Sequence, residues 1–104
     1  MDFRDRVYKI IKQIPAGKVA TYSQIGQKLG NRRLARAVGA ALKNNKNSFV
    51  ICRDRKIAVP CHRVVCATGK IGGFNEGLKK KRLLLQKEGV KVFGGRIDLK
   101  TFGW

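Results

Sequence analysis

A pair of short helical patterns joined by a glycine turn constrains the fold of this chain most. Thr21 and Gln24 have the spacing of a helix-capping box, and Gly30 is placed to end the helix that they begin. Asn31 can cap a second helix over residues 32–43, in which apolar residues recur at helical spacing. Two short helices joined in this way predict a helix-turn-helix, an element that commonly binds DNA.

The segments around this unit predict further helices and a few short strands. Asp2 can cap an amphipathic helix over residues 2–13, and a leucine-containing segment predicts another helix over residues 76–87. Residues 44–59 contain two apolar runs around a charged tetrapeptide, which is typical of a hairpin or a looped-out strand pair. We therefore expect one domain, residues 1–104, of mainly helical α/β class: a winged-helix-like helix-turn-helix with short strands.

The net charge of the chain indicates a polyanionic partner. There are 24 Lys and Arg residues and six Asp and Glu residues, which gives a formal charge of +18. Such self-repulsion destabilises a compact protein unless salt or a polyanion screens it, so nucleic acid is the favoured partner. A membrane surface is the alternative, but the sequence has no spanning apolar run, basic amphipathic helix or lipidation motif. The basic block at residues 79–82 is expected to be a solvated face that could also reach phosphates.

The second helix of the helix-turn-helix combines basic and very small side chains. Its basic residues are Arg32, Arg33, Arg36 and Lys43, and its small residues are Ala35, Ala37, Gly39 and Ala40. Small residues let a helix lie close to another surface, and this is a reason to accept a mid-helix glycine, which costs about 1 kcal/mol relative to alanine. The alternative is tight packing against a neighbouring helix with solvated arginines, but the net charge favours contact with DNA.

A cysteine beside a histidine is the strongest candidate for chemistry. Cys61 follows Pro60, which fixes the backbone before the thiol, and precedes His62, which can take part in proton transfer. The cysteine could pack in the core, bind a metal or act as a nucleophile, and a nucleophilic thiol needs a lowered pKa. Three cysteines, an odd number, and no secretory signal predict reduced thiols, and the lack of a C-x-x-C pair disfavours zinc.

Five motifs occur in an order and at spacings that identify a family resemblance. Together they resemble the DNA-binding domain of the O6-alkylguanine-DNA alkyltransferases, and the resemblance covers roughly residues 3–93. The Pro-Cys-His-Arg element combined with the upstream Arg-Ala-Val-Gly helix is the most specific part. The motifs are residues 14–22 (IPAGKVATY), 35–39 (ARAVG), 60–65 (PCHRVV), 69–74 (GKIGGF) and 88–90 (EGV).

The resemblance implies a suicide DNA-repair reaction. The domain would bind the minor groove of DNA through the helix-turn-helix, flip a damaged guanine out of the stack and transfer its O6-alkyl group irreversibly to Cys61. His62 would take the thiol proton through a water, and Glu88 would orient that histidine. Tyr22 would donate to the guanine ring nitrogen as negative charge develops there, and Asn45 would brace the active-site turn.

The resemblance also implies which residues meet DNA and the flipped base. Arg36 would enter the duplex and occupy the space left by the extruded base. The other DNA-contacting residues would be Thr21, Tyr22, Ala35, Ala37, Gly39 and Arg63. The pocket for the base would be formed by Val64, Gly72, Gly73, Phe74 and Asn75. The reaction would need no cofactor and no metal, and its partner would be double-stranded DNA that contains O6-alkylguanine.

The sequence departs from the family pattern in three places. The family usually carries a large N-terminal domain before this one, and we expect that domain to be absent here. Residues 46–59 are longer than the corresponding link in the family, so Asn47 competes with Asn45 for the bracing role. Phe74 and Asn75 occupy the place of an aromatic-serine pair near the alkyl pocket.

Two other functions fit part of the pattern. A non-enzymatic alkyltransferase-like sensor would bind O6-alkylguanine in DNA, but that class commonly has tryptophan where this chain has Cys61. A winged-helix transcription factor would bind a specific sequence in the major groove and leaves the pairing of Cys61 with His62 without a purpose. We therefore expect a monomeric, single-turnover DNA alkyltransferase that is cytoplasmic, associated with the nucleoid and not with a membrane.

Overall fold

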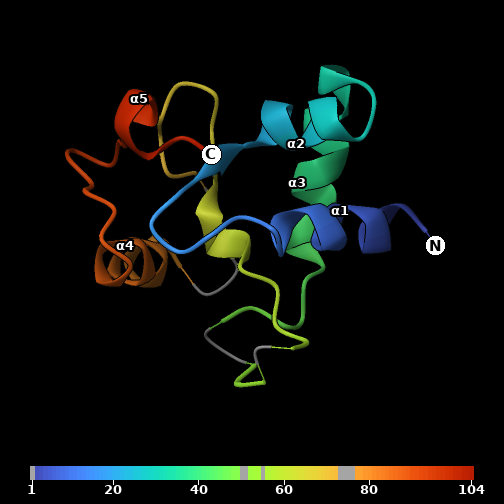
Figure 1. The fold of residues 1–104 in the computed structure, drawn as a ribbon, viewed down its shortest axis with the longest axis horizontal. Coiled ribbons are helices and arrows are strands. Elements are labelled where there is room, and N and C mark those ends of the chain that lie inside the picture. The colour runs from blue at the N-terminus through green and yellow to red at the C-terminus, as the bar shows by residue number, and fades with distance from the viewer. Residues whose placement is uncertain (1, 50–51, 55, 73–76) are drawn as a thin grey trace.

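The computed structural model describes residues 2–49, 52–54, 56–72 and 77–104 (Figure 1). In chain order the elements are α1 (Phe3–Ile11), β1 (Ala20–Thr21), α2 (Tyr22–Lys28), η1 (Arg32–Leu34), α3 (Ala35–Lys43), η2 (Cys61–Arg63), β2 (Val64–Val65), α4 (Leu78–Lys87) and α5 (Leu99–Phe102), where η denotes a 3-10 helix. Helices α1, α2 and α3 gather on one side of the strand pair, and α4 and α5 lie on the other side (Figure 1).

The helix-turn-helix predicted from the sequence is confirmed in α2 and α3. The Thr21 hydroxyl oxygen accepts a hydrogen bond from the Gln24 N–H at 3.0 Å, and the Gln24 side chain accepts one from the Thr21 N–H, which completes the capping box. Gly30 has a φ of +114°, a left-handed conformation that suits glycine. This conformation ends α2, because it lets the Asn31 N–H reach the Gly26 carbonyl oxygen at 3.0 Å.

The second helix of this unit starts later than the sequence indicates. The Asn31 side chain does act as a cap, accepting from the Arg33 N–H at 2.9 Å, but the element that it caps is the 3-10 helix η1. Leu34 then has a ψ of 2°, away from α-helical values, so the α-helix begins only at Ala35. The expected helix over residues 32–43 is therefore two elements.

A short parallel sheet joins the helix-turn-helix to the cysteine. Strand β1 leads directly into α2, and strand β2 directly follows η2, which begins with Cys61. Ala20 pairs with Val64, and Thr21 pairs with Val65. Because neighbouring strands lie about 4.8 Å apart, this pairing holds the start of α2 near the end of η2.

The C-terminal segment folds back onto β1. The Val19 N–H donates to the Phe102 carbonyl oxygen, and the Trp104 N–H donates to the Val19 carbonyl oxygen, both at 2.8 Å. Val19 and Gly103 thereby form a parallel bridge beside the sheet. The Gln24 side chain also donates to the Trp104 carbonyl oxygen, so this segment supports the start of α2 as well.

Two groups of buried apolar side chains hold the elements together. The first lies among α1, α2, α3 and η2 and includes Cys61 itself, of which 5% is exposed. The second lies among the sheet, α4 and the C-terminal segment, and its members are Val19, Val65, Ile71, Leu85, Val90 and Ile97. Val64 belongs to the first group and Val65 to the second, because successive side chains of a strand point to opposite faces. Strand β2 is therefore shared by both groups.

The hairpin expected over residues 44–59 was wrong for the described part of that segment, in which no residue lies in a strand. The Cys52 N–H donates to the Ser48 carbonyl oxygen at 2.8 Å, and the Val59 N–H donates to the Asn47 carbonyl oxygen at 2.7 Å. These bonds close a loop with its two ends side by side and leave no ladder between two strands. Residues 50, 51 and 55 lie outside the described residues.

Helix α4 also differs from the expectation. It begins at Leu78, because Gly77 before it has a φ of +97°, which no helix contains. Lys81, expected on a solvated face, is fully buried, since it shares one face of the helix with Leu85 four residues later. Among the described residues, no helix is long and apolar enough to cross a membrane.

Candidate active site

Cys61 is held by a tight turn. Its N–H donates to the Val59 carbonyl oxygen at 2.8 Å across Pro60, whose φ of −78° and ψ of 61° are those of an inverse γ-turn. The fixed φ of proline favours this conformation. None of the three cysteines is disulfide-bonded. The sequence therefore places a reduced thiol on a constrained backbone, at the start of η2, the 3-10 helix that directly precedes β2.

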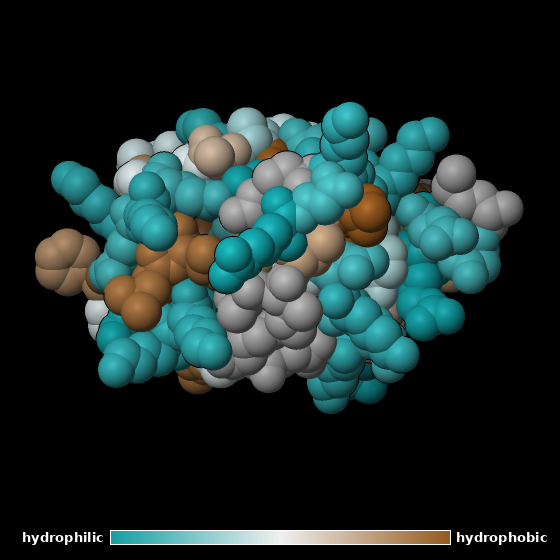
Figure 2. Space-filling view, turned by 90° about the horizontal axis from the view of Figure 1, so that it is seen from below, coloured by the Kyte–Doolittle hydropathy of each residue, from teal (hydrophilic) through white to brown (hydrophobic). Residues whose placement is uncertain are grey.

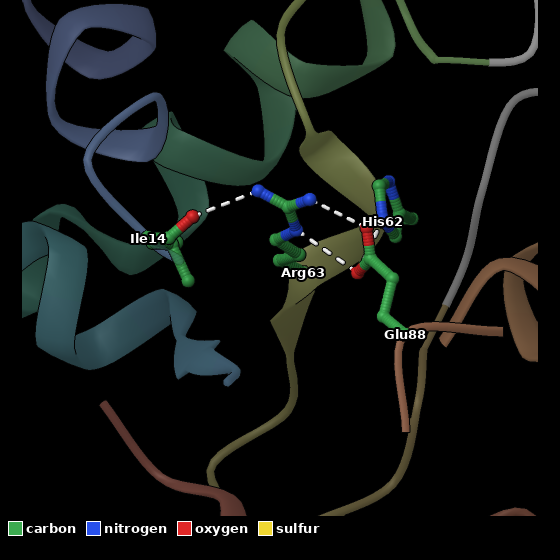
Figure 3. Close-up of polar contacts among 4 residues, drawn as sticks. All are labelled: Ile14, His62, Arg63 and Glu88. Carbon is green, nitrogen blue, oxygen red and sulfur yellow. Dashed lines mark hydrogen bonds and ion pairs between the residues drawn. The ribbon is translucent and has the colours of Figure 1, made fainter. Parts of the chain in front are cut away.

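His62 and Glu88 form a hydrogen-bonded pair next to the cysteine. The His62 Nε2 atom lies 3.0 Å from Glu88 Oε1 (Figure 3). Burial lowers the pKa of His62, and the bond to Glu88 opposes that shift. A neutral imidazole that donates from Nε2 to a carboxylate keeps its lone pair on Nδ1. Because His62 Nδ1 has no hydrogen-bond partner among the described residues, it is the atom available as a base.

Arg63 holds the other side of Glu88. Its Nε donates to Glu88 Oε1 at 3.0 Å, its Nη2 donates to Oε2, and its Nη1 donates to the Ile14 carbonyl oxygen at 2.8 Å (Figure 3). Burial alone would raise the pKa of Glu88, but the bonds from His62 and Arg63 outweigh it and lower the pKa to about 2. Glu88 is therefore ionised at neutral pH and can orient His62 as an anion.

Phe49 contacts both side chains that bind Glu88. Its ring centroid lies 5.2 Å from that of His62, with 53° between the planes. The Arg63 guanidinium carbon lies 5.0 Å from the same centroid, a cation–π distance. The loop over residues 44–59 therefore contributes a wall of this site.

Lys81 reaches the cysteine turn from α4. Its Nζ donates to the Val64 carbonyl oxygen at 2.7 Å, and the side chain is fully buried. Burial lowers the pKa of Lys81 to about 8, and the Cys61 and Cys66 thiols oppose that shift. Lys81 is mainly cationic at neutral pH, and a cation beside a thiol favours the thiolate form.

Tyr22, the first residue of α2, faces the same region. Burial raises the pKa of Tyr22 to about 12, and the Cys66 and Cys61 thiols add to the rise, so its hydroxyl stays protonated and can donate. A Cβ atom at Gly72, which has a φ of +72°, would lie 3.5 Å from Tyr22 Oη and 3.1 Å from Cys66 Sγ. Glycine therefore keeps open a space beside the tyrosine hydroxyl.

Asn45 lies against the turn that carries Cys61. It is buried, its Nδ2 donates to the Val59 carbonyl oxygen at 3.5 Å, and its Oδ1 accepts from the Asn47 N–H at 3.0 Å. Val59 is two residues before Cys61 and also accepts the γ-turn hydrogen bond. This position fits the bracing role expected for Asn45 better than for Asn47, whose own side chain is exposed.

The residues expected to contact DNA divide into two groups. Arg36 is exposed on α3, and Ala35, Ala37 and Gly39 on the same helix are partly exposed. A Cβ atom at Gly39 would lie 4.0 Å from the Tyr22 ring, so α3 approaches that tyrosine closely. The Thr21 hydroxyl serves the capping box, and the Arg63 guanidinium is buried in its bonds to Glu88 and Ile14. The Arg63 guanidinium thus supports the site through these bonds, and the DNA contact expected for Arg63 stays a prediction.

The pocket residues are placed only in part. The Val64 side chain is fully buried in the core, so only its backbone can face a flipped base. Gly72 keeps space open beside Tyr22, as described above. Gly73, Phe74 and Asn75 lie outside the described residues.

Sequence reasoning missed Lys81, Phe49 and the Ile14 carbonyl group. The spacing of Lys81 and Leu85 on one helical face was the available signal for Lys81, but the surrounding basic block obscured it. The contacts of Phe49 and Ile14 span loops and had no local signal. In the described part of the chain, no three His, Cys, Asp or Glu side chains gather as a metal site requires.

The fold and the site can now be compared with known proteins. Residues 2–90 match the family model described as the DNA-binding domain of 6-O-methylguanine DNA methyltransferase. A methylated-DNA–protein-cysteine methyltransferase of Saccharolobus islandicus is 47% identical over 90 residues, which are 86% of this chain and 52% of that protein.

Two solved structures resemble the chain closely. The structure of Mycobacterium tuberculosis OGT in complex with DNA has a TM-score of 0.74 and 39% identity over 86% of this chain and 49% of that one. The structure of S. pombe Atl1 in complex with damaged DNA containing O6-carboxymethylguanine has a TM-score of 0.81 and 29% identity over 98% of this chain and 94% of that one.

The fold and the site define a helix-turn-helix protein with a buried cysteine and histidine and a partly buried glutamate bound to that histidine. This chain belongs to the 6-O-methylguanine DNA methyltransferase family and has the fold of its DNA-binding domain, as the resemblance indicated. The chain spans about half the length of the curated relatives that it matches.

Proposed function

We propose that this protein repairs DNA by transferring the alkyl group of O6-alkylguanine irreversibly to its own Cys61. It would act as a methylated-DNA–protein-cysteine methyltransferase, the name of its Saccharolobus relative. The observation that carries the proposal is the hydrogen-bonded His62–Glu88 pair directly after a constrained cysteine. The solved complex of Atl1 with O6-carboxymethylguanine DNA supports the class of substrate.

The transfer is a displacement at the alkyl carbon. The Cys61 sulfur forms a bond to that carbon while the carbon–O6 bond breaks, and its electron pair moves into the guanine ring. The thiol proton passes through a water to His62 Nδ1, the available lone pair of the ring. Glu88 stabilises the imidazolium that forms, and the Lys81 ammonium favours the thiolate before attack.

Tyr22 assists the departure of guanine. Negative charge develops on the purine as the carbon–oxygen bond breaks, and a donor at a ring nitrogen stabilises it. The Tyr22 hydroxyl is partly buried and protonated at neutral pH, so it can donate there without losing its proton. Because the thioether that forms on Cys61 has no route back to a thiol, each molecule acts once.

The helix-turn-helix presents the lesion to this site. The exposed Arg36 on α3 enters the minor groove and fills the gap left by the flipped guanine. The small residues around it let α3 lie close to the sugar-phosphate backbone. Gly72 leaves space for the base beside Tyr22, and Asn45 keeps the cysteine turn rigid.

The test is intact-protein mass spectrometry after incubation with a duplex that carries one O6-methylguanine. We expect a stoichiometric gain of one methyl group that peptide mapping places on Cys61. Cys61→Ser should abolish the gain and keep DNA binding, whereas the matched variant Cys52→Ser, at a partly exposed cysteine, should react normally. Normal methylation of the Cys61→Ser protein would disprove the assignment of the acceptor.

A lesion sensor without transfer is the second candidate. The observation in its favour is the match to Atl1, which covers nearly the whole of both chains. A sensor would bind a duplex with O6-methylguanine more tightly than an undamaged duplex, yet its mass would stay unchanged. The presence of a thiol at position 61, next to a competent base, makes transfer the better supported function.

A further inference from the structure

A pocket of about 560 Å³ lies between α4, the turn at residues 94–95 and the segment that follows β2. Its volume falls within the range of about 300–1,000 Å³ that is typical of ligand pockets. Apolar atoms, including those of Ile71 and Leu78, form most of its lining. Cys61 and His62 do not line this pocket, but Gly72 and Cys66 do, so the pocket adjoins the space that Gly72 keeps open beside Tyr22.

Basic side chains surround this pocket. Lys70, Lys79 and Arg82 line it, and each of them is exposed. Among the described residues, both ion pairs involve Glu88, whose carboxylate is already bound by His62 and Arg63. The surface around the pocket is therefore strongly positive and suits an anionic ligand.

Exposed apolar groups lie on the same end of the molecule. Phe93 is 84% exposed and directly precedes the pocket residue Gly94, while Leu83 on α4 is 52% exposed. Figure 2 shows one face of the molecule, on which apolar residues gather at one end among hydrophilic side chains. Helix α4 lies at the same end of the molecule in Figure 1. An aromatic ring and an apolar pocket within a basic rim can bind both the bases and the phosphates of a nucleic acid.

We propose that this surface, made of the pocket, its three basic residues and Phe93, binds an unpaired single strand of DNA. The phosphates contact Lys70, Lys79 and Arg82, one base enters the pocket and another stacks on Phe93. A duplex fits less well, because its bases are stacked inside and cannot reach an apolar pocket. An acidic protein would match the charge but gives no specific use for an apolar pocket beside an exposed ring.

The surface lies apart from the helix-turn-helix. Helices α2 and α3 lie on one side of the sheet and α4 lies on the other (Figure 1). A DNA molecule with a duplex segment and a single-stranded segment could thus contact both regions. The proposal does not depend on alkyl transfer, because a strand without guanine should bind as well.

The experiment measures binding of dye-labelled oligothymidylate of about 12 nucleotides, which offers no guanine, by fluorescence anisotropy. The variant Lys79→Ala/Arg82→Ala should bind about 10-fold more weakly. The slope of log K against log salt should flatten by about 1.4, since each lost phosphate contact on a single strand contributes about 0.7. Phe93→Ala should also weaken binding about 10-fold through lost stacking.

Two controls separate this site from the rest of the charge. Arg6→Ala/Lys9→Ala removes two exposed cations from α1 and should change binding less than 3-fold. Arg36→Ala should bind oligothymidylate like the unmodified protein. Equal losses in the α1 and α4 double variants, or a large loss in Arg36→Ala, would overturn the proposal. Polyglutamate binding should also be measured. If Lys79→Ala/Arg82→Ala and Phe93→Ala weaken it as much as they weaken oligothymidylate binding, the proposal is overturned. The surface would then not distinguish a nucleic acid from any other polyanion.

Discussion

The Lys81 Nζ atom donates a 2.7 Å hydrogen bond to the Val64 carbonyl oxygen from a position with no exposure to solvent. A buried ammonium group is costly unless hydrogen bonds and nearby negative charge compensate it. The Val64 carbonyl supplies one bond, and the nearby Cys61 and Cys66 thiols oppose the lowering of the Lys81 pKa by burial. Lys81 thus joins helix α4 to the strand that follows the cysteine turn, through this hydrogen bond and through its charge.

The first prediction concerns Lys81 and stability at high pH. The pKa of Lys81 falls from 10.5 to about 8 on folding, so between these values the unfolded chain binds more protons than the folded one. Stability should therefore rise with pH through this window, by on the order of 1–3 kcal/mol. Urea unfolding of wild type and Lys81→Met from about pH 7 to 10 checks this, because the difference between the two proteins should change with pH. A constant difference would contradict it.

The second prediction concerns Lys81 and thiol reactivity. Lys81→Met removes a positive charge beside Cys61 with little change in volume. We expect iodoacetamide to modify Cys61 several-fold more slowly at neutral pH, because the thiolate is the reactive form. Peptide mass spectrometry gives the rate for Cys61 separately from Cys52, whose rate serves as the internal reference. An unchanged rate at Cys61 would show that the lysine has only a structural role.

The third prediction concerns Glu88 and acid. Its pKa falls from 4.5 to about 2 on folding, so the ionised carboxylate stabilises the protein above about pH 4.5. That contribution is lost as the pH falls towards 2. The free energy of unfolding of Glu88→Gln should therefore lie furthest below that of wild type near neutral pH. This gap should narrow by on the order of 1–3 kcal/mol on acidification. Chemical denaturation at several pH values measures it, and parallel curves would rule out the shift.

The fourth prediction separates support from DNA contact at Arg63. Arg63→Leu leaves the partly buried Glu88 carboxylate without its bidentate partner and frees the Ile14 carbonyl group. We expect a loss of about 3–5 kcal/mol in stability. At a temperature where the variant remains folded, the affinity for undamaged duplex should change less than in Arg36→Ala. A larger loss of affinity than in Arg36→Ala would instead support the DNA contact that the sequence predicts for Arg63.

The fifth prediction concerns Arg36. Because this side chain is exposed on α3 and would act only on the duplex, Arg36→Ala should slow repair of a duplex lesion by about 10-fold or more. The reaction with free O6-benzylguanine should stay within about 2-fold of wild type. Single-turnover rates on both substrates check this, and equal losses on both would count against insertion into the duplex.

The parts of the fold that the sequence predicted are those with local signals. The helix-turn-helix was predictable because capping and helix termination involve residues close in sequence, here Thr21, Gln24 and Gly30. The pairing of Ala20 with Val64 and of Val19 with Gly103 had no such signal, because two-residue strands carry too little periodicity. The loop over residues 44–59 was misread since apolar runs in short segments do not distinguish a strand from a packed loop.

The candidate site divides in the same way. The motif resemblance gave expectations for Cys61, His62 and Glu88, and the structure brings His62 and Glu88 into contact. The burial of Arg63 was not foreseen because basic residues are usually exposed, and the partly buried Glu88 carboxylate that binds it explains that burial. Lys81 was missed for the same reason. Burial of a charge depends on a partner distant in sequence, which a local pattern does not reveal.

The bonds between Val19 and the C-terminal segment bear on how this molecule can be shortened or labelled. A fragment cut at residue 90, where the family match ends, would remove both hydrogen-bond partners of Val19 and the acceptor of the Gln24 side chain. The boundary of a recognisable motif is thus not the boundary of the unit that must be expressed. A fluorophore or affinity tag attached at Trp104 would disturb the support of the helix that begins with Tyr22.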